Sequence, residues 1–410
     1  MPFRIALSGL NAAQSDLNVT ANNVANTATN GFKGSRAEFA DLFAVSLQGV
    51  SSNSSGNGVR VSNVAQQFAQ GNIEFTESNL DLAISGQGLF VLSDSGALSY
   101  SRAGAFQADR NGYVVNAAQQ RLQVYPPLGA GGFNTGGLSD LRLQTTDAAP
   151  QATSEVEYVL NLPANAVPPA ITPFDPNDPN TFNQATSLTL FDSLGAAHTG
   201  TQYFTKTANP NEWNTRLYID GTAVDGGVPG ASITLQYTNV GLLTAPAGGL
   251  AVFPAYTPAT GAANMTVTMD LSRTTQFGAN FAVNSVTQDG FTTGRLIGID
   301  INETGIVQAR FTNGRSQALG QIAIANFSNV QGLQQLGNTQ WAETFASGQA
   351  LRGQAGNSGF GLVQSGALEA SNVDITEELV KMITAQRNFQ ANAQMISTAD
   401  QVTQSIINIR

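Results

Sequence analysis

The sequence has no cysteine, one histidine and few charged residues. Without cysteine the chain can form no disulfide, no thiolate metal site and no cysteine nucleophile. A single histidine leaves no second imidazole for a histidine-based metal cluster. Charged residues make up 11% of the 410 residues, against about 25% in ordinary soluble domains. The expected surface is therefore polar but largely uncharged.

Long apolar runs and positive charge are also scarce. No run approaches the roughly 18 residues that a membrane helix needs, so we expect no membrane insertion. The start, "MPFRIALSGLNAAQ", lacks the charged leader and apolar stretch of a signal peptide, so an exported product would use another route. The formal net charge of -10, with only 18 Lys and Arg residues, argues against nucleic acid as a partner.

Proline marks a boundary inside the chain, because 12 of the 15 prolines lie between Pro150 and Pro258 and none follows. Acidity is concentrated there too: residues 145–284 carry ten acidic side chains and three basic ones. Alternating segments such as "SLTLFDSLG" and "WNTRLYIDGTAV" are typical of strands. We predict an inserted acidic outer β domain over residues 146–284.

Two further β-rich stretches flank this insertion, at residues 72–145 and 285–359. Each contains hairpin turn signals, among them Asn111-Gly112 and Asn313-Gly314. Because the insertion separates the two stretches, we predict one discontinuous β-rich core domain made from both. Residues 31–71 and 360–369 form the predicted linker region, which includes a low-complexity Ser, Gly and Asn segment.

Both ends of the chain show helical periodicity. Residues 1–30 and 370–410 carry apolar residues in alternating steps of three and four, the pattern of a coiled-coil seam. Gly31 is the expected stop of the first helix, and Asp374 or Thr376 the expected cap of the second. The predicted fold class is therefore mainly β with α-helical termini that pair as a coiled coil.

Both predicted helices also carry side-chain amides at every fourth residue. Asn18, Asn22, Asn26 and Asn30 follow this spacing, as do Gln386, Gln390 and Gln394. An amide both donates and accepts, so crowded helices can exchange hydrogen-bond partners without burying a charge. An exposed polar helix face is the alternative, and the recurrence at both ends favours shared contacts.

Candidate chemical sites are weak. His198 lies in the small-residue segment "GAAHTG" and is expected on the surface. Asp175 and Asp178 lack the alternating ligands of a calcium loop, and the neighbouring prolines favour an extended turn. The Gly-rich segments match no phosphate-binding motif. We expect no catalytic site, no metal and no cofactor.

The segment "SGLNAAQSDLNVTANNVANTATNGFKGSRAEFADLF" resembles the N-terminal signature of bacterial flagellar rod and hook proteins. The resemblance continues through "LDLAISGQGLFVL", "SVTQDGFTTGRLIGIDINETGIVQARFTNG" and "SGALEASNVDITEELVKMITAQRNFQ". It covers roughly residues 1–145 and 285–410, and the insertion matches less clearly. The length and the acidic insertion are similar to hook members of the family; distal rod members are shorter.

The resemblance implies a structural subunit that polymerises into a curved tube, a universal joint between rod and filament. It implies export through the flagellar type III apparatus and an extracellular location in the flagellum. The implied partners are further copies of the chain, the distal rod protein, the hook-filament junction proteins, the hook cap and the export apparatus. A distal rod subunit remains an alternative. A carbohydrate-binding or glycan-hydrolysing protein using Trp213 and Trp341 is a remote one.

Assembly would depend on the terminal segments, which we expect to be largely disordered in the free subunit and to order on polymerisation. The segment "NGFKGSRAEFADLF" would lead into a linker that bridges subunits, with a surface helix as the alternative. The predicted self-assembly residues are Phe3, Leu7, Leu10, Leu17, Asn22, Val24, Asn26, Phe32, Phe39, Phe43, Leu379, Met382, Gln386, Phe389, Gln390, Ile396, Val402 and Ile406.

Overall fold

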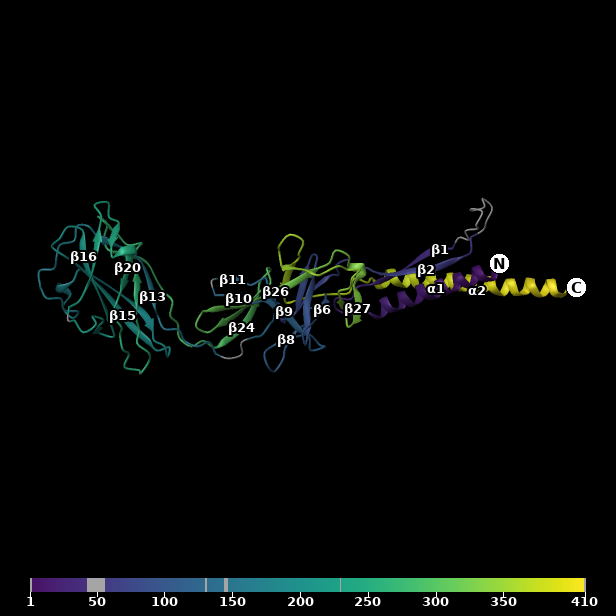
Figure 1. The fold of residues 1–410 in the computed structure, drawn as a ribbon, viewed down its shortest axis with the longest axis horizontal. Helices are drawn as coiled ribbons and strands as arrows, with labels where there is room; N and C mark the ends of the chain where they lie inside the picture. Colours follow the sequence, from purple (N-terminus) through teal and green to yellow (C-terminus); the bar gives the residue numbers. More distant parts are fainter. Residues whose placement is uncertain (1, 43–55, 130, 144–146, 229, 409–410) are drawn as a thin grey trace. The chain divides into compact units, whose positions relative to one another are not determined.

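The computed structural model describes residues 2–42, 56–129, 131–143, 147–228 and 230–408 (Figure 1). The chain divides into two compact units. Unit 1 comprises Met1–Thr145, Gly298–Arg310 and Ser316–Arg410, and unit 2 comprises Thr146–Ile297 and Phe311–Arg315. The fold is mainly β with a helix at each end, as predicted from the sequence.

Helix α1 (Pro2–Ala25) and helix α2 (Ile375–Asn408) lie side by side in unit 1 (Figure 1). The Asp374 carboxylate caps α2 by accepting hydrogen bonds from the amides of Thr376 and Glu377. Helix α1 ends before the Gly31 stop expected from the sequence, and residues 26–31 form turns instead. The departure has a physical reason, because these turns bring the Gly31 amide to the Glu369 carbonyl at 2.7 Å.

The strands of unit 1 join segments from both sides of the insertion. In the large antiparallel sheet, Ile322 pairs with Val124 and Ile324 with Phe90. The described part of this sheet follows the order β24-β25-β26-β9-β5-β6-β28-β27. Its strands are β5 (Leu89–Asp94), β6 (Ala97–Ser101), β7 (Gln107–Ala108), β8 (Val114–Val115), β9 (Arg121–Tyr125), β12 (Ser139–Asp140), β24 (Leu296–Ile301), β25 (Ile306–Phe311), β26 (Ser316–Asn326), β27 (Gln334–Gly337), β28 (Gln340–Ala342) and β29 (Leu351–Gln354).

The turn signals expected from the sequence form hairpins: Asn111-Gly112 lies between β7 and β8, and Asn313-Gly314 between β25 and β26.

Two short ladders connect the β core to the helical end of unit 1. The ladders consist of β3 (Ile73–Phe75) with β31 (Ala367–Glu369) and β4 (Leu82–Ser85) with β30 (Leu362–Ser365), and β10 (Pro127–Leu128) with β11 (Gly132–Phe133) forms a separate small hairpin.

The predicted linker contains regular structure in its described part. Strands β1 (Ser35–Asp41) and β2 (Val59–Gln66) form an antiparallel pair, with a register shift at Glu38 and Phe39. The alternative of a surface helix in this segment is therefore wrong. The amide of Val59 donates to the Ser8 hydroxyl, so the strand pair is attached to α1.

Unit 2 consists of two sheets that enclose one core. The largest buried side chain is Trp213, and Tyr158 and Phe204 contribute from the two different sheets. One sheet contains β13 (Glu155–Pro163), β20 (Leu250–Val252), β21 (Thr268–Asp270), β22 (Thr275–Phe277) and β23 (Ala282–Gln288). The other contains β14 (Gln184–Phe191), β15 (Ala197–Lys206), β16 (Glu212–Ile219), β17 (Thr222–Ala223), β18 (Ile233–Tyr237) and β19 (Leu243–Ala245).

A close backbone approach at Gly104 provides a test of the unit 1 core. A Cβ atom added to Gly104 would lie 1.7 Å from the Leu82 carbonyl oxygen and 3.1 Å from the Phe90 ring. We expect Gly104→Ala to destabilise unit 1 by about 1–3 kcal/mol, the usual range for overpacking. The measurement is hydrogen exchange of peptides from β5 and β26 in increasing urea. Gly137→Ala is the matched control, because nothing lies within 4 Å of its Cβ position; equal effects would contradict the prediction.

Candidate assembly interface

The two terminal helices meet through small and polar side chains. Asn23 donates to the Glu378 carboxylate at 3.2 Å, and a Cβ on Gly9 would lie 2.5 Å from the Asn392 side chain. These two contacts are two heptads apart on each helix and run in opposite directions, so the pair is antiparallel. The seam residues are Ala6, Gly9, Ala13, Asp16, Thr20 and Asn23 on α1, and Glu378, Met382, Ala385, Phe389, Asn392 and Ile396 on α2.

The predicted apolar seam is offset from this observed one. Leu7 and Leu379 are 42% and 44% exposed, and Phe3 is exposed as well. Met382, Phe389 and Ile396 lie partly buried on α2, and their role in self-assembly stays a prediction. Within one subunit, therefore, the larger apolar residues of α1 are left near the surface. Leu10, Leu17 and Val24 are half-buried, Val402 is exposed, and Phe43 and the side chain of Ile406 lie outside the described part of the structure.

The amide ladder of α1 bonds along its own helix. Asn26 donates to the side chain and the carbonyl of Asn22, and Gln14 donates to Asn18. The residue that bonds across the helix pair is Asn23, which is not part of the ladder. Exchange of amide partners between subunits stays a prediction. Asn22, Gln386 and Gln390 are exposed, so they are accessible in the single chain.

A buried carboxylate holds the base of the helix pair to the β core. Glu369, at the end of β31, is 0% exposed and accepts from Lys33 Nζ and from Arg102 Nε, each at 2.6 Å. The remaining Arg102 donors reach the backbone carbonyls of Ile84, Gly86 and Gly88. The ion pairs thus join the segment after α1, the loop after β6 and the segment before α2.

Further hydrogen bonds join the chain segments that meet around Glu369. The Asn372 amide donates to the carbonyls of Gln67 and Ala69, and its oxygen accepts from the Gly34 amide at 2.8 Å. Gly31 has φ +68°, and a Cβ there would lie 2.4 Å from the Ala103 nitrogen, so the position requires glycine. We call residues 31–35, 67–71, 369–372 and Arg102 the junction cluster.

The electrostatics of the junction cluster are those of a buried ion pair with one excess positive charge. Burial lowers the pKa of the Lys33 ammonium, and the charge of Glu369 opposes but does not cancel that shift. Removing water from such groups costs several kcal/mol per ion, which only the pairing offsets. Loss of the carboxylate would leave both cations buried without a counter-charge.

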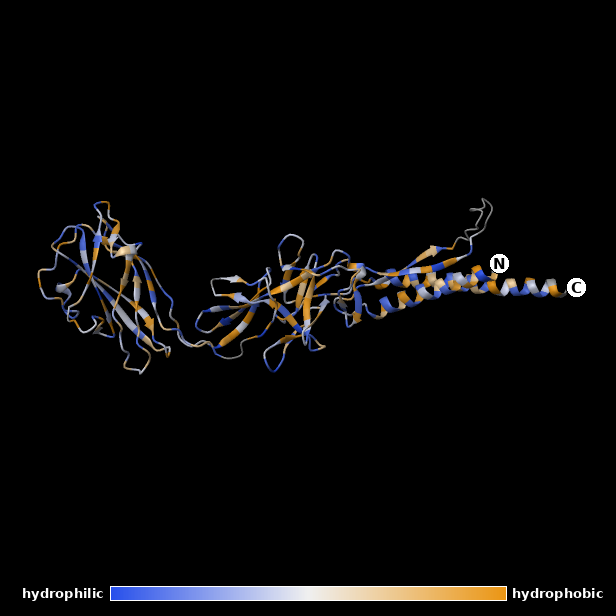
Figure 2. Ribbon diagram, viewed as in Figure 1, coloured by the Kyte–Doolittle hydropathy of each residue, from blue (hydrophilic) through white to orange (hydrophobic). Residues whose placement is uncertain are grey.

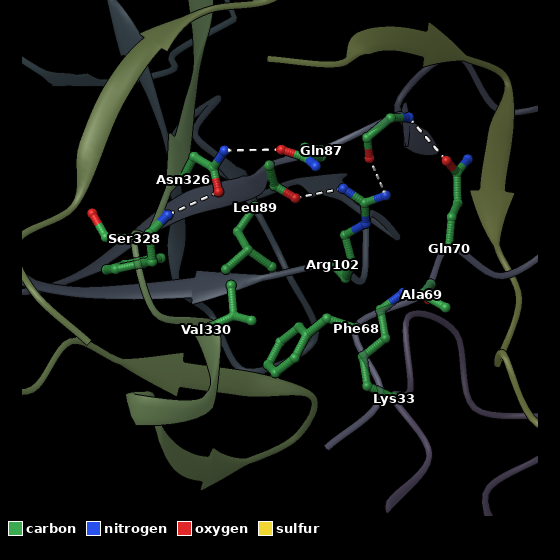
Figure 3. Close-up of a pocket in the computed structure, with 13 residues that line it drawn as sticks. Lys33, Phe68, Ala69, Gln70, Gln87, Leu89, Arg102, Asn326, Ser328 and Val330 are labelled. Atoms are coloured by element: carbon green, nitrogen blue, oxygen red, sulfur yellow. Dashed lines mark hydrogen bonds between the residues drawn. The ribbon is translucent and has the colours of Figure 1, made fainter. Parts of the chain in front are cut away.

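A pocket of ≈ 550 Å³ lies beside the junction cluster (Figure 3). Phe68, Leu89 and Val330 give it apolar walls, while Lys33 and Arg102 lie at its edge. Both cations already bond to Glu369 and to backbone carbonyls, so the pocket offers mainly apolar surface and the amides of its rim.

Comparisons with known proteins match the chain along its whole length. Four family models apply: "Flagella basal body rod protein" at residues 3–33, "Flagellar hook protein FlgE/F/G D1 domain" at 83–171, "Flagellar basal body protein FlaE D2 domain" at 161–291 and "Flagellar basal body rod FlgEFG protein C-terminal" at 364–409. The flagellar hook protein FlgE of Escherichia coli K12 is 39% identical over 418 residues, covering 100% of both chains. The chain belongs to the flagellar hook protein family.

Other relatives agree with this hook protein assignment. FlgE of Borreliella burgdorferi is 31% identical over 440 residues, covering 98% of both chains. The crystal structure of Helicobacter pylori FlgE2 has a TM-score of 0.56 at 14% identity, over 72% of this chain and 100% of that one, which shows a shared fold. These relatives are structural proteins of the flagellum and support the function of a hook subunit. No helix in the described ranges has the length and apolar character needed to cross a membrane.

Sequence reasoning missed the junction cluster of this hook-family chain. Arg102, Glu369 and Asn372 were not singled out, and Lys33 was noted only as part of the segment expected to lead into a linker, because separations of up to 338 residues give no local signal. The composition did contain a usable signal. The chain has few charged residues, yet Lys33 lies in the otherwise uncharged segment "NGFKGS" and Glu369 in "GALEASN", so each is a single charge among small or apolar neighbours. Of the linker phenylalanines, Phe32 is half-buried and Phe39 is exposed on β1.

Three sequence expectations concern other side chains. The expectation of a surface His198 is wrong, because it is 6% exposed and lies between two carboxylates in unit 2. Asp175 and Asp178 do form turns, accepting from the amides of Asn177 and Asn180. Trp213 and Trp341 are both buried, in different units, so neither offers a ring face to a sugar.

Removing the buried carboxylate tests the junction cluster. We expect Glu369→Gln to destabilise unit 1 by about 3–5 kcal/mol, since breaking a buried ion pair leaves its partners uncompensated. The measurement is hydrogen exchange of unit 1 peptides in urea. Glu38→Gln is the matched control, because its ion pair with Arg36 is exposed and contributes little. A loss no larger than that of the control would show that the cluster does not hold the fold.

Proposed function

We propose that this hook subunit self-assembles into a curved tube that acts as a universal joint, transmitting motor torque from rod to filament. The observation that carries the proposal is the uncovered apolar surface of the terminal helices. Phe3 and Leu7 form an exposed row on α1, and Ile375, Leu379 and Ile383 one on α2. Large exposed apolar surfaces mark interaction sites, and here further copies of the chain would cover them.

The register of the helix pair leaves additional surface free on α2. Because Gly9 lies opposite Asn392, residues of α2 beyond about residue 399 have no partner on α1. Val402 and Ile407, within this free length, are exposed. Figure 2 shows that hydrophobic residues recur along the ribbon of α2 toward the C-terminus. The free end of α2 and the exposed apolar rows along both helices are different surfaces of the subunit. Contacts between different surfaces of neighbouring copies are head-to-tail contacts, which generate open helical polymers.

The intramolecular seam is too small to hold the helices firmly alone. Ala6, Ala13 and Ala385 bury little apolar area, and Gly9 buries none with a side chain. We therefore retain the expectation that the helices are disordered in the free subunit and order when neighbouring copies cover them. The junction cluster is the point at which this disorder would end.

Bending is expected to use polar contacts. A tube that bends must let contacts shorten on one side and lengthen on the other during each revolution. Exposed amides such as Asn22 and Gln386 can exchange partners at low cost, whereas strong ion pairs would resist. The low charge content of the chain is consistent with this mechanism.

The remaining assignments are part of the same proposal. Residues 1–30 with 370–410 would form the inner layer, 72–145 with 285–359 the middle layer and 146–284 the outer layer. The partners would be the distal rod protein, the junction proteins, the cap and the export apparatus, with neither nucleic acid nor membrane insertion. Export would be by the flagellar type III route, and we assign no enzymatic activity. A distal rod subunit would instead form a straight, rigid tube.

Charge placed on the exposed helix rows should prevent polymerisation. We expect Leu7→Asp and Leu379→Asp to abolish tubes, because burying an unpaired carboxylate at a subunit contact costs several kcal/mol. The β units should stay folded, since both side chains lie outside the intramolecular core. Sedimentation and electron microscopy after salt-induced assembly measure the outcome. Leu7→Met and Leu379→Met are matched controls that keep the apolar area and should assemble; normal tubes from the Asp variants would refute the proposal.

Limited proteolysis tests ordering on assembly. We expect trypsin to cut the monomer after Arg4, Lys381 and Arg387, in the helices, and to leave Lys33 and Arg102 intact because the junction cluster buries them. In the polymer the helix sites should become protected. Mass spectrometry of the fragments identifies the cuts. Protection of Lys381 and Arg387 in the dilute monomer would show that the helices are ordered before assembly.

A further inference from the structure

His198 in unit 2 has both ring nitrogens against carboxylates. It lies on β15, opposite Leu190 of β14. Its Nδ1 is 2.6 Å from Asp220 Oδ2, and its Nε2 is 3.2 Å from Asp192 Oδ2. Tyr256 is the ring packed nearest, with centroids 6.1 Å apart.

The hydrogen-bond pattern determines the charge of this imidazole. Asp192 Oδ1 accepts from the amides of Leu194 and Ala196, and its Oδ2 accepts from the Thr260 hydroxyl at 2.8 Å. Asp220 Oδ1 accepts from the Thr199 amide. Both carboxylates therefore act only as acceptors, so both ring nitrogens must donate. A neutral imidazole has a single N–H, and only the imidazolium satisfies both contacts.

The Asp192 carboxylate also holds a separate loop of unit 2. Residues 256–265 form a loop closed by reciprocal hydrogen bonds between Tyr256 and Met265, both 2.8 Å. Thr260 donates to Asp192, and the Ala263 amide donates to the Ser193 hydroxyl at 2.9 Å. The loop is thus attached to the 192–196 turn through groups that the His198 charge holds in place.

We propose that His198 is a pH-sensitive latch: as an imidazolium it ties Asp220 to Asp192, and its deprotonation at alkaline pH releases loop 256–265. On deprotonation the short Nδ1–H contact to Asp220 is kept. Loss of the Nε2 proton leaves a lone pair that faces Asp192 Oδ2. Asp192 stays ionised, because three other donors still bond to its carboxylate. The two acceptors repel, and the turn and the loop move apart.

The pKa directions set the pH range of the latch. Burial opposes a charged His198, but hydrogen bonds and charges of Asp220 and Asp192 outweigh it and raise its pKa above 6.5. Burial likewise opposes ionised Asp192, but hydrogen bonds from Thr260, Ala196 and His198 lower its pKa to about 2. The pKa of Asp220 is also lowered, by His198 and the Thr199 amide against burial, while burial and Asp220 raise that of Tyr256. The His198 contribution to stability is complete below pH 6.5 and is lost as pH rises through the raised pKa. The contributions of Asp192 and Asp220 to stability are lost only as pH falls through their lowered pKa values.

Because the chain has one histidine, nuclear magnetic resonance of the ¹⁵N-labelled full chain reports this site alone. We expect two-bond ¹H–¹⁵N correlations to show an imidazolium with both nitrogens protonated below pH 6.5 and a titration midpoint above 6.5. Exchange of the Tyr256 and Met265 amides, corrected for intrinsic pH dependence, should increase at least several-fold across the same midpoint. A neutral tautomer below pH 6.5, or loop protection that does not change with pH, would overturn the proposal.

Two variants separate the latch from general stability. Asp220→Asn should lower the His198 midpoint. Asp225→Asn should not, because the Asp225 carboxylate, in the same unit, bonds to the Gly227 amide and not to His198 among the described contacts. His198→Gln keeps a neutral donor and should make loop exchange independent of pH. A His198 midpoint unchanged by Asp220→Asn, or pH-dependent loop exchange in His198→Gln, would contradict the latch. The wild-type titration decides the question by itself if a variant fails to fold.

Discussion

The buried Glu369 carboxylate is the interaction on which the helical end of unit 1 depends. It accepts from Lys33 and Arg102 at 2.6 Å; both cations precede the insertion in the sequence, whereas Glu369 follows it. Charges are costly to bury, so the three groups are stable only together. Their pairing therefore sets where each terminal segment leaves the β core, and with it where α1 and α2 can begin to pair.

In the helix pair that follows, the two backbones lie close together, and several large apolar side chains of both helices stay exposed. Small and polar side chains line the α1 side of the seam, so the backbones approach closely, and the larger Met382, Phe389 and Ile396 of α2 are only partly buried. The exposed rows of Phe3, Leu7, Ile375 and Leu379 are then available to other copies. A firm anchor next to a weak helix pair is a combination that suits a subunit whose ends gain their stability from the polymer.

Unit 2 follows a different plan. Its two sheets enclose an apolar core, and residues 145–284, with ten acidic and three basic side chains, carry -7 of the chain's net charge of -10. The single histidine is placed between two of those carboxylates, which makes the local hydrogen bonding depend on one proton. By our proposal, this is where, among the described residues, a rise to alkaline pH has a direct structural consequence. It is local to the 192–196 turn and the 256–265 loop.

The sequence by itself determined the fold class, the two terminal helices and several hairpins, because periodicity and turn residues act over a few positions. Asn111-Gly112 and Asn313-Gly314 form turns for that reason. It did not determine which helix face is paired: Leu7 and Ala6 both fit a heptad, and only the approach of α2 selected the alanine. The junction cluster and the burial of His198 were likewise decided by the tertiary structure. Their partners are distant in sequence, and the cost of burying a charge is known only when the groups that offset it are in place.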